Sequence, residues 1–105
     1  MAIPKRDESQ LASAREAATA ARRKRAELKA MLSRGDISLG EALSRAAGDR
    51  VLANMKVSEL LRALPRIGDR RASALMESLT IAPNRRIRGL GRLQVAGLKA
   101  EFGER

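Results

Sequence analysis

The sequence of 105 residues contains no cysteine, histidine, tryptophan or tyrosine, and Phe102 is its only aromatic residue. Without cysteine, disulfides and thiolate chemistry are excluded. Because histidine is also missing, the usual nucleophile and general-base combinations cannot form. Metal sites built on these two residues are excluded as well, and the scattered carboxylates indicate no magnesium site. We therefore expect a protein that is not an enzyme and that uses no metal and no cofactor.

Long apolar runs are absent too. No stretch approaches the length that spans a membrane, and charged residues occupy positions 5–8, where a signal peptide has its apolar core. Together with the lack of cysteine, these features predict a soluble, cytoplasmic protein with no membrane partner. The composition indicates no small-molecule substrate.

Positive charge, in contrast, is abundant. The chain has 22 lysine and arginine residues against 12 acidic ones, a formal net charge of +10, which predicts a polyanion as partner. The excess lies at the two ends, with nine basic and four acidic residues in 1–34 and six basic and two acidic residues in 80–105. Single-stranded nucleic acid is disfavoured because its bases stack on aromatic side chains, so a duplex is the expected target.

The pattern of apolar residues is helical, without strand-like alternation or internal repeats. From about Asp7 to Ser33 the chain is rich in Ala, Arg, Lys, Glu and Leu and has no Gly or Pro, which favours one long helix. Its larger apolar residues lie mostly after position 27, so we expect the second half to pack on a core and the first half to project or fray. The basic run Arg22, Arg23, Lys24 and Arg25 fits either a solvated helix or a second nucleic-acid contact.

Several shorter helices are expected after Gly35. Ser38 and Glu41 form a capping-box pattern for a helix that ends near Gly48, and Asp49 is placed to cap a short helix. Further helices are predicted over residues 57–64, 68–79 and 93–102, the last with Leu93, Leu98 and Phe102 towards the core and Gly97 as a weak point.

The first candidate site is the turn Leu64-Pro65-Arg66-Ile67-Gly68, which opens a helix beginning with Asp69, Arg70 and Arg71. The first amides of a helix have no partner within it and lie at the positive end of its dipole, so such a turn can bind a phosphate. The alternative is an ordinary interhelical turn, which also favours Pro and Gly. Asp69 weakens the phosphate interpretation, because an acid there is expected to cap the amides itself.

The second candidate site is the segment after that helix, whose four arginines have no acid among them. Its two glycines give backbone freedom, its composition excludes a helix interior, and its charge is expected to keep it from folding on itself. Arginine suits DNA binding because its planar fork spans phosphate oxygens and enters a narrow minor groove. The alternative is a solvated loop. The segment reads Ala82-Pro83-Asn84-Arg85-Arg86-Ile87-Arg88-Gly89-Leu90-Gly91-Arg92.

Turn, helix and arginine segment together resemble the small actinobacterial integration host factor family, which is unrelated to the heterodimeric β-arm proteins of the same name. The resemblance covers almost the whole chain and is strongest in Met55-Lys56-Val57-Ser58, in the turn 64–68 and in residues 81–91. It implies an all-α fold, a small compact helical domain with a long N-terminal helix and a helix-two-turn-helix motif.

The resemblance also implies a function and its residues. The expected protein is a monomeric, nucleoid-associated protein that binds double-stranded DNA with little sequence specificity, shapes or bends it, and assists recombination, integration and transcription. Residues 1–34 would form a long basic helix, partly projecting, and residues 35–105 the DNA-binding domain. The implied DNA-binding residues are Leu64, Pro65, Arg66, Ile67, Gly68, Asp69, Arg70 and Arg71 in the motif (about 64–71), and Pro83, Asn84, Arg85, Arg86, Arg88, Gly89, Gly91 and Arg92 in a lid (about 82–94).

Two features of the family resemblance bear on the phosphate contact and on the expected partner. Family members usually carry a basic residue where this chain has Asp69, which bears on the phosphate contact of the turn. Helix-two-turn-helix segments also occur in a small-subunit ribosomal protein, so structured RNA or the ribosome is the competing partner.

Overall fold

The structure, a computed structural model, describes residues 8–104. This part of the chain is helical and forms no strand beyond one isolated bridge, so the predicted all-α class is confirmed. The expected helix start at Asp7 lies outside the described residues. The elements are α1 (Glu8–Arg34), α2 (Leu39–Ala47), α3 (Arg50–Ala53), α4 (Val57–Arg62), α5 (Asp69–Ser78), the 3-10 turn η1 (Ile87–Gly89) and α6 (Arg92–Glu101).

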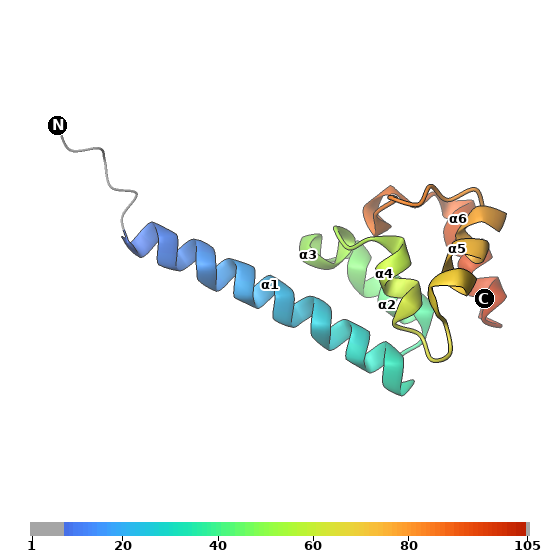
Figure 1. Ribbon diagram of the computed structural model, residues 1–105, viewed down its shortest axis with the longest axis horizontal. Helices are drawn as coiled ribbons and strands as arrows, with labels where there is room; N and C mark the ends of the chain where they lie inside the picture. The colour runs from blue at the N-terminus through green and yellow to red at the C-terminus, as the bar shows by residue number, and fades with distance from the viewer. Residues whose placement is uncertain (1–7, 105) are drawn as a thin grey trace.

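Helix α1 runs for 27 residues, and its first half extends away from the folded body (Figure 1). Residues 8–20 are all exposed, because this half offers mainly alanine to a core. Leu28 and Leu32, one turn apart, are buried and hold the second half against the body. The helix ends at Arg34 and is followed by Gly35, whose φ of 77° lies in the left-handed region that glycine adopts without strain.

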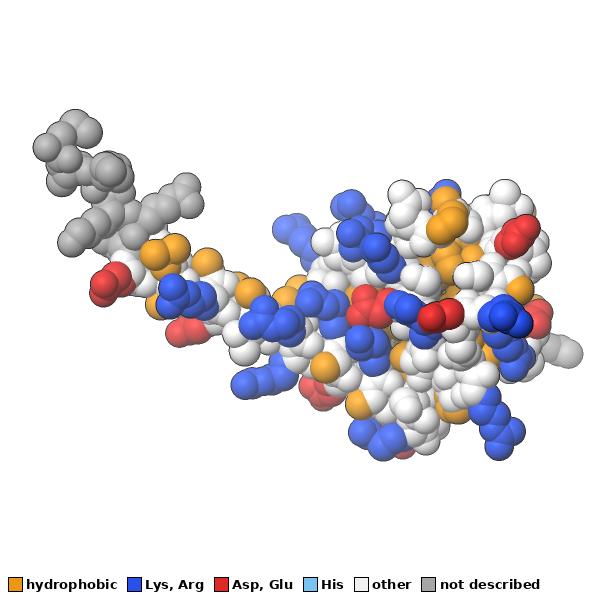
Figure 2. Space-filling model, viewed as in Figure 1, with side chains coloured by type: hydrophobic (Ala, Val, Ile, Leu, Met, Phe, Trp, Pro, Cys, Tyr) orange, Lys and Arg blue, Asp and Glu red, His pale blue; other side chains and the backbone are white. Residues whose placement is uncertain are grey.

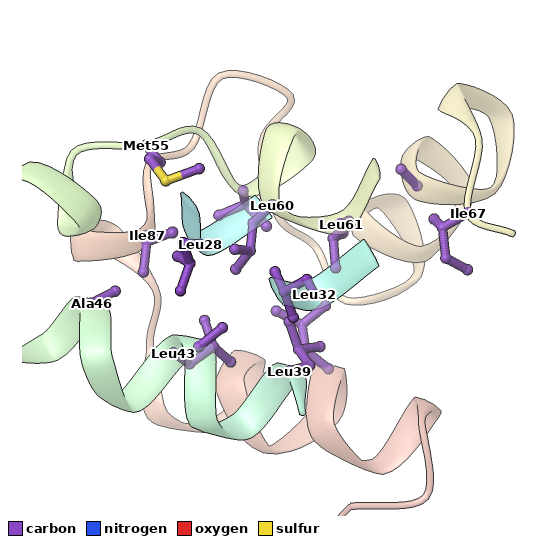
Figure 3. Close-up of a cluster of buried hydrophobic side chains, with 14 of the residues drawn as sticks. Leu28, Leu32, Leu39, Leu43, Ala46, Met55, Leu60, Leu61, Ile67 and Ile87 are labelled. Carbon is purple, nitrogen blue, oxygen red and sulfur yellow. The ribbon is translucent and has the colours of Figure 1, made fainter. Parts of the chain in front are cut away.

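The body is organised around one apolar core to which every described helix contributes at least one buried side chain (Figure 3). Leucines dominate it, and the fully buried alanines Ala42 and Ala46 let α2 approach its neighbours closely. Phe102 packs only at the edge. The prediction for Leu93 was wrong, since its side chain is 85% exposed. Leu93 and Leu98 are five residues apart, which places them about 140° apart around the helix.

The predicted helix caps form. The Ser38 hydroxyl accepts a hydrogen bond from the Glu41 amide at 3.0 Å, although the Glu41 carboxylate bonds Arg45 instead of completing the capping box. The Asp49 carboxylate accepts from the amides of Val51 and Leu52, as its position before α3 predicts.

Asp49 also joins α1 to the body, because its carboxylate lies 2.8 Å from the Lys24 ammonium. The hydrogen bond from Lys24, aided by the two amides at the start of α3, outweighs partial burial and holds the pKa of Asp49 below its ordinary value. A second ion pair joins Lys29 of α1 to Glu59 of α4, also at 2.8 Å. The second half of α1 is therefore fixed by two ion pairs in addition to its buried leucines.

Candidate nucleic-acid interface

The turn between α4 and α5 is anchored to the core of the protein by a buried side chain. The Ile67 side chain is 6% exposed and belongs to the core, and the Ile67 amide donates to the Leu64 carbonyl at 3.2 Å. The left-handed residue of the turn is Arg66, with a φ of 65°, whereas Gly68 has an extended backbone. Pro65 and Arg66 are exposed and Leu64 is half-buried, so the turn presents its backbone outward from a fixed base.

Helix α5 begins with an open end. No side chain in the described part of the chain caps it, and the first amide to find a helical acceptor is that of Ala72, which donates to the Gly68 carbonyl. A Cβ atom added at Gly68 would meet nothing within 4 Å. Arg70 and Arg71 are exposed in the first turn. Free amides at the positive end of a helix dipole, with open space before them, form the geometry that binds an anion.

Asp69 does not cap these amides, contrary to the prediction. It is the first residue of α5, one position past the capping residue Gly68. Its carboxylate accepts a hydrogen bond from Arg62 of α4 at 3.1 Å and is itself highly exposed. This hydrogen bond holds the guanidinium of Arg62 next to the first residue of α5.

The lid segment is not a loop kept open by its own charge, so that prediction was also wrong. Ile87 is 7% exposed, and its amide donates to the Met55 carbonyl at 2.9 Å. The Val57 amide donates to the Arg85 carbonyl at the same distance, and Lys56 and Arg86 form an antiparallel bridge. Backbone pairing and one apolar anchor hold the lid to the segment before α4, while the side chains of Arg86, Arg88 and Arg92 remain exposed.

Two lid arginines are partly engaged within the protein. Arg85 is half-buried and donates to the Gly89 carbonyl at 2.9 Å. A Cβ at Gly89 would come within 2.8 Å of the Arg85 Cδ, so glycine permits this approach. Arg86 donates to the Asn54 carbonyl at 2.6 Å but is exposed. The remaining predicted lid residues are also exposed: Pro83, Asn84, Arg88, Gly89, Gly91 and Arg92.

Two surface hollows connect the turn with the lid, and Arg62 lines both. One, of about 1010 Å³, runs between α1 and the turn and includes Arg66 and Gly68. The other, of about 500 Å³, reaches from Arg62 to Arg86 of the lid. Figure 2 shows lysine and arginine side chains along α1 and on the adjoining body. The structure thus brings the two predicted sites to neighbouring parts of one basic surface.

Three further basic residues line the second hollow: Arg25, which belongs to the basic run predicted as a possible second nucleic-acid contact, and Lys56 and Arg62, which the sequence did not assign to a site. For Arg25 a signal was available, because it precedes Leu28 by three residues and Leu32 by seven, which puts a charge on the buried face of α1. A charged residue on the buried face of a helix indicates that its side chain binds a partner. Arg62 carried no comparable signal, since its position depends on the path of the turn.

Within residues 8–104, no helix combines the length and apolarity needed to cross a membrane. No group of three or more acidic, histidine or cysteine side chains is arranged to hold a metal ion in that range.

Comparison with known proteins identifies the family. The model of the S13-like H2TH domain matches residues 32–102. The chain is 50% identical over 103 residues to the integration host factor of Mycobacterium tuberculosis, with 98% of both chains covered. It belongs to the integration host factor family. The factor of Mycolicibacterium smegmatis is 49% identical over 104 residues, covering 99% of both.

A solved structure has the same fold. This is sIHF bound to an 8-base-pair palindromic DNA, with a TM-score of 0.81 and 48% identity, and the match covers 84% of this chain and 99% of that one. The curated integration host factor relatives are named as host factors and not as enzymes. The matched H2TH region begins at Leu32, in the last turn of α1, and includes the turn and the lid.

Proposed function

We propose that this member of the integration host factor family is a nucleoid-associated protein of the cytoplasm that binds double-stranded DNA with little sequence specificity. By bending or shaping DNA it assists recombination, integration and transcription. The observation that carries the proposal is the open amino end of α5 together with the exposed arginines of the lid, which two hollows that share Arg62 connect. The DNA-bound relative supports it.

In the proposed complex, the motif residues 64–71 bind a backbone phosphate. The amides of Asp69, Arg70 and Arg71 face the anion, and the two arginines add charge from the first turn of α5. Gly68 leaves room for the phosphate because no neighbouring atom fills the space beside it. Leu64 and Ile67 position the turn from the core side.

The lid residues 82–94 approach the minor groove. Arg86, Arg88 and Arg92 supply exposed guanidinium groups, while Arg85 keeps the lid in shape through Gly89. Contacts of this kind sense phosphate positions and groove width more than base identity. Pro83, Asn84 and Gly91 complete the lid surface.

The proposal assigns no catalytic step, cofactor or metal to the protein. Residues 35–105 are the DNA-binding domain, the first half of the basic helix α1 projects from it, and the protein acts as a monomer. With about four phosphates neutralised, the slope of log K against log salt should be about −3.6.

The proposal is tested by titrating the protein with DNA and RNA duplexes of the same length and sequence, at salt concentrations from about 50 to 200 mM. We expect tighter binding to DNA, about a hundredfold loss of affinity over that salt range, and similar affinities for scrambled DNA sequences. Tighter binding to the RNA duplex would support the ribosomal alternative. A salt-independent affinity would exclude the phosphate contacts.

A further inference from the structure

Arg25, Lys56, Arg62 and Arg86 face one hollow of about 500 Å³ between α1, α4 and the lid. These residues come from separate parts of the chain, and folding brings them together. The hollow also contains Glu59, but the carboxylate of Glu59 is bound by Lys29 at 2.8 Å. The single acid that lines this hollow is therefore already paired.

The cations of the hollow are not all paired in this way. Within residues 8–104, the side chains of Arg25 and Lys56 make no ion pair and no hydrogen bond. Arg62 reaches towards Asp69, and Arg86 donates to a backbone carbonyl. Like charges held close together repel, and the repulsion is relieved when an anion binds among them.

Arg25 is also held in place. The Lys24–Asp49 ion pair precedes it, the Lys29–Glu59 pair follows it by one turn, and Leu28 is buried three residues later. Its backbone is thus fixed against α3 and α4, unlike the exposed first half of α1. The larger apolar residues predicted that the helix packs on the core mainly after position 27, whereas the ion pair of Lys24 already fixes it three residues earlier. A cation fixed in advance loses less entropy on binding.

We propose that this hollow binds a further backbone phosphate of the same DNA duplex, with Arg25 and Lys56 as its main ligands. The inference rests on the proposed function and extends the DNA path from the lid to the second half of α1. The path is continuous because Arg62 and Glu59 line both this hollow and the one beside the turn. A duplex bound by turn and lid would therefore pass the hollow.

The experiment compares Arg25→Gln with Arg23→Gln in the full-length protein. Arg23 is exposed on the same helix, and two residues place it about 200° around from Arg25. Both variants lose one charge. For Arg25→Gln we expect the salt slope of DNA binding to become shallower by about 0.9, the value for one phosphate contact. Arg23→Gln should keep the wild-type slope.

Lys56→Gln gives a second, independent variant. If both residues bind the same phosphate, it reproduces the slope change of Arg25→Gln, and the double variant loses little more than either single one. Arg25→Lys should restore most of the slope. Thermal unfolding of each variant checks that the fold is intact. Equal slopes for Arg25→Gln and Arg23→Gln in folded proteins overturn the proposal.

A lid variant separates this inference from the proposed function. If Arg88→Ala combined with Arg92→Ala, two exposed lid residues outside the hollow, abolishes DNA binding while Arg25→Gln behaves as Arg23→Gln does, only the further phosphate contact is wrong. If the lid variant also binds DNA normally, the proposed function of the lid fails as well.

Discussion

Ile87→Ala should weaken DNA binding although it removes no charge. Ile87 is the apolar anchor that fastens the lid to the core, with 7% of its surface exposed. Figure 3 shows its side chain in the buried cluster, on the side where Met55 and Leu28 lie. Once the anchor is lost, the lid is held mainly by the two backbone hydrogen bonds to residues 55 and 57. The exposed arginines of the lid would then be ordered only when DNA binds, and the entropy lost in ordering them would weaken binding.

The magnitude follows from the surroundings of Ile87. Replacing a buried isoleucine by alanine costs about 2–5 kcal/mol. We expect about 2–3 kcal/mol, because Ile87 also lines a surface hollow of about 520 Å³ that water can enter. For a domain of this size the Tm falls by about 10–20 °C. Re-ordering the lid should weaken DNA binding about tenfold, or 1.4 kcal/mol.

The control is Leu39→Ala, which removes a fully buried side chain of α2 that lies apart from Ile87 in Figure 3. It should lower the free energy of unfolding at least as much as Ile87→Ala and leave the lid attached. Both variants are titrated with a DNA duplex at a temperature where thermal unfolding curves show them folded. If they bind DNA equally well, the anchoring of the lid does not contribute to binding and the reasoning is refuted.

Three further outcomes are expected. Gly68→Ala should fold normally, because its methyl group meets no atom, and should weaken DNA binding several-fold in the same titration; unchanged binding would argue against a phosphate at the turn. Asp69→Asn should raise the affinity at low salt, since it removes a negative charge beside α5 and releases Arg62; a loss of affinity would contradict this. Asp49→Asn should lower the Tm at neutral pH more than at acidic pH. The bond from Lys24 depresses the pKa of Asp49 in the folded state, so its contribution to stability is present above the unfolded pKa and is lost as pH falls through the folded one; thermal unfolding at several pH values tests it, and a pH-independent difference would be the contrary result.

Local signals predicted much of this structure. The caps at Ser38 and Asp49 depend only on residues two or three positions away, so the sequence alone could place them. The end of the first helix at Gly35 was predictable for the same reason. The turn at 64–68 was located correctly because proline and glycine mark it in the sequence.

Features that depend on distant contacts were not predictable in this way. Ile87 stands between two arginines, and its burial follows from pairing with Met55, 32 residues earlier. The prediction for Leu93 was wrong in the opposite direction, because this residue was expected to be buried and is exposed. A leucine in the first turn of a helix can face either the core or the solvent. Gly97, expected to weaken its helix, lies where a Cβ would come within 2.6 Å of the Leu79 side chain. Gly97 allows its helix to pack closely against Leu79, and the spacing of apolar residues in the sequence does not reveal such a contact.

The shape of the molecule affects how its oligomeric state should be measured. Because α1 projects, the protein extends 61 Å along its longest axis and only 27 × 25 Å across. An elongated particle experiences more friction in solution than a sphere of equal mass. On gel filtration a monomer of 11.4 kDa would therefore elute early, at the volume of a larger globular standard. Light scattering or sedimentation equilibrium, which report mass independently of shape, would distinguish such a monomer from a true dimer.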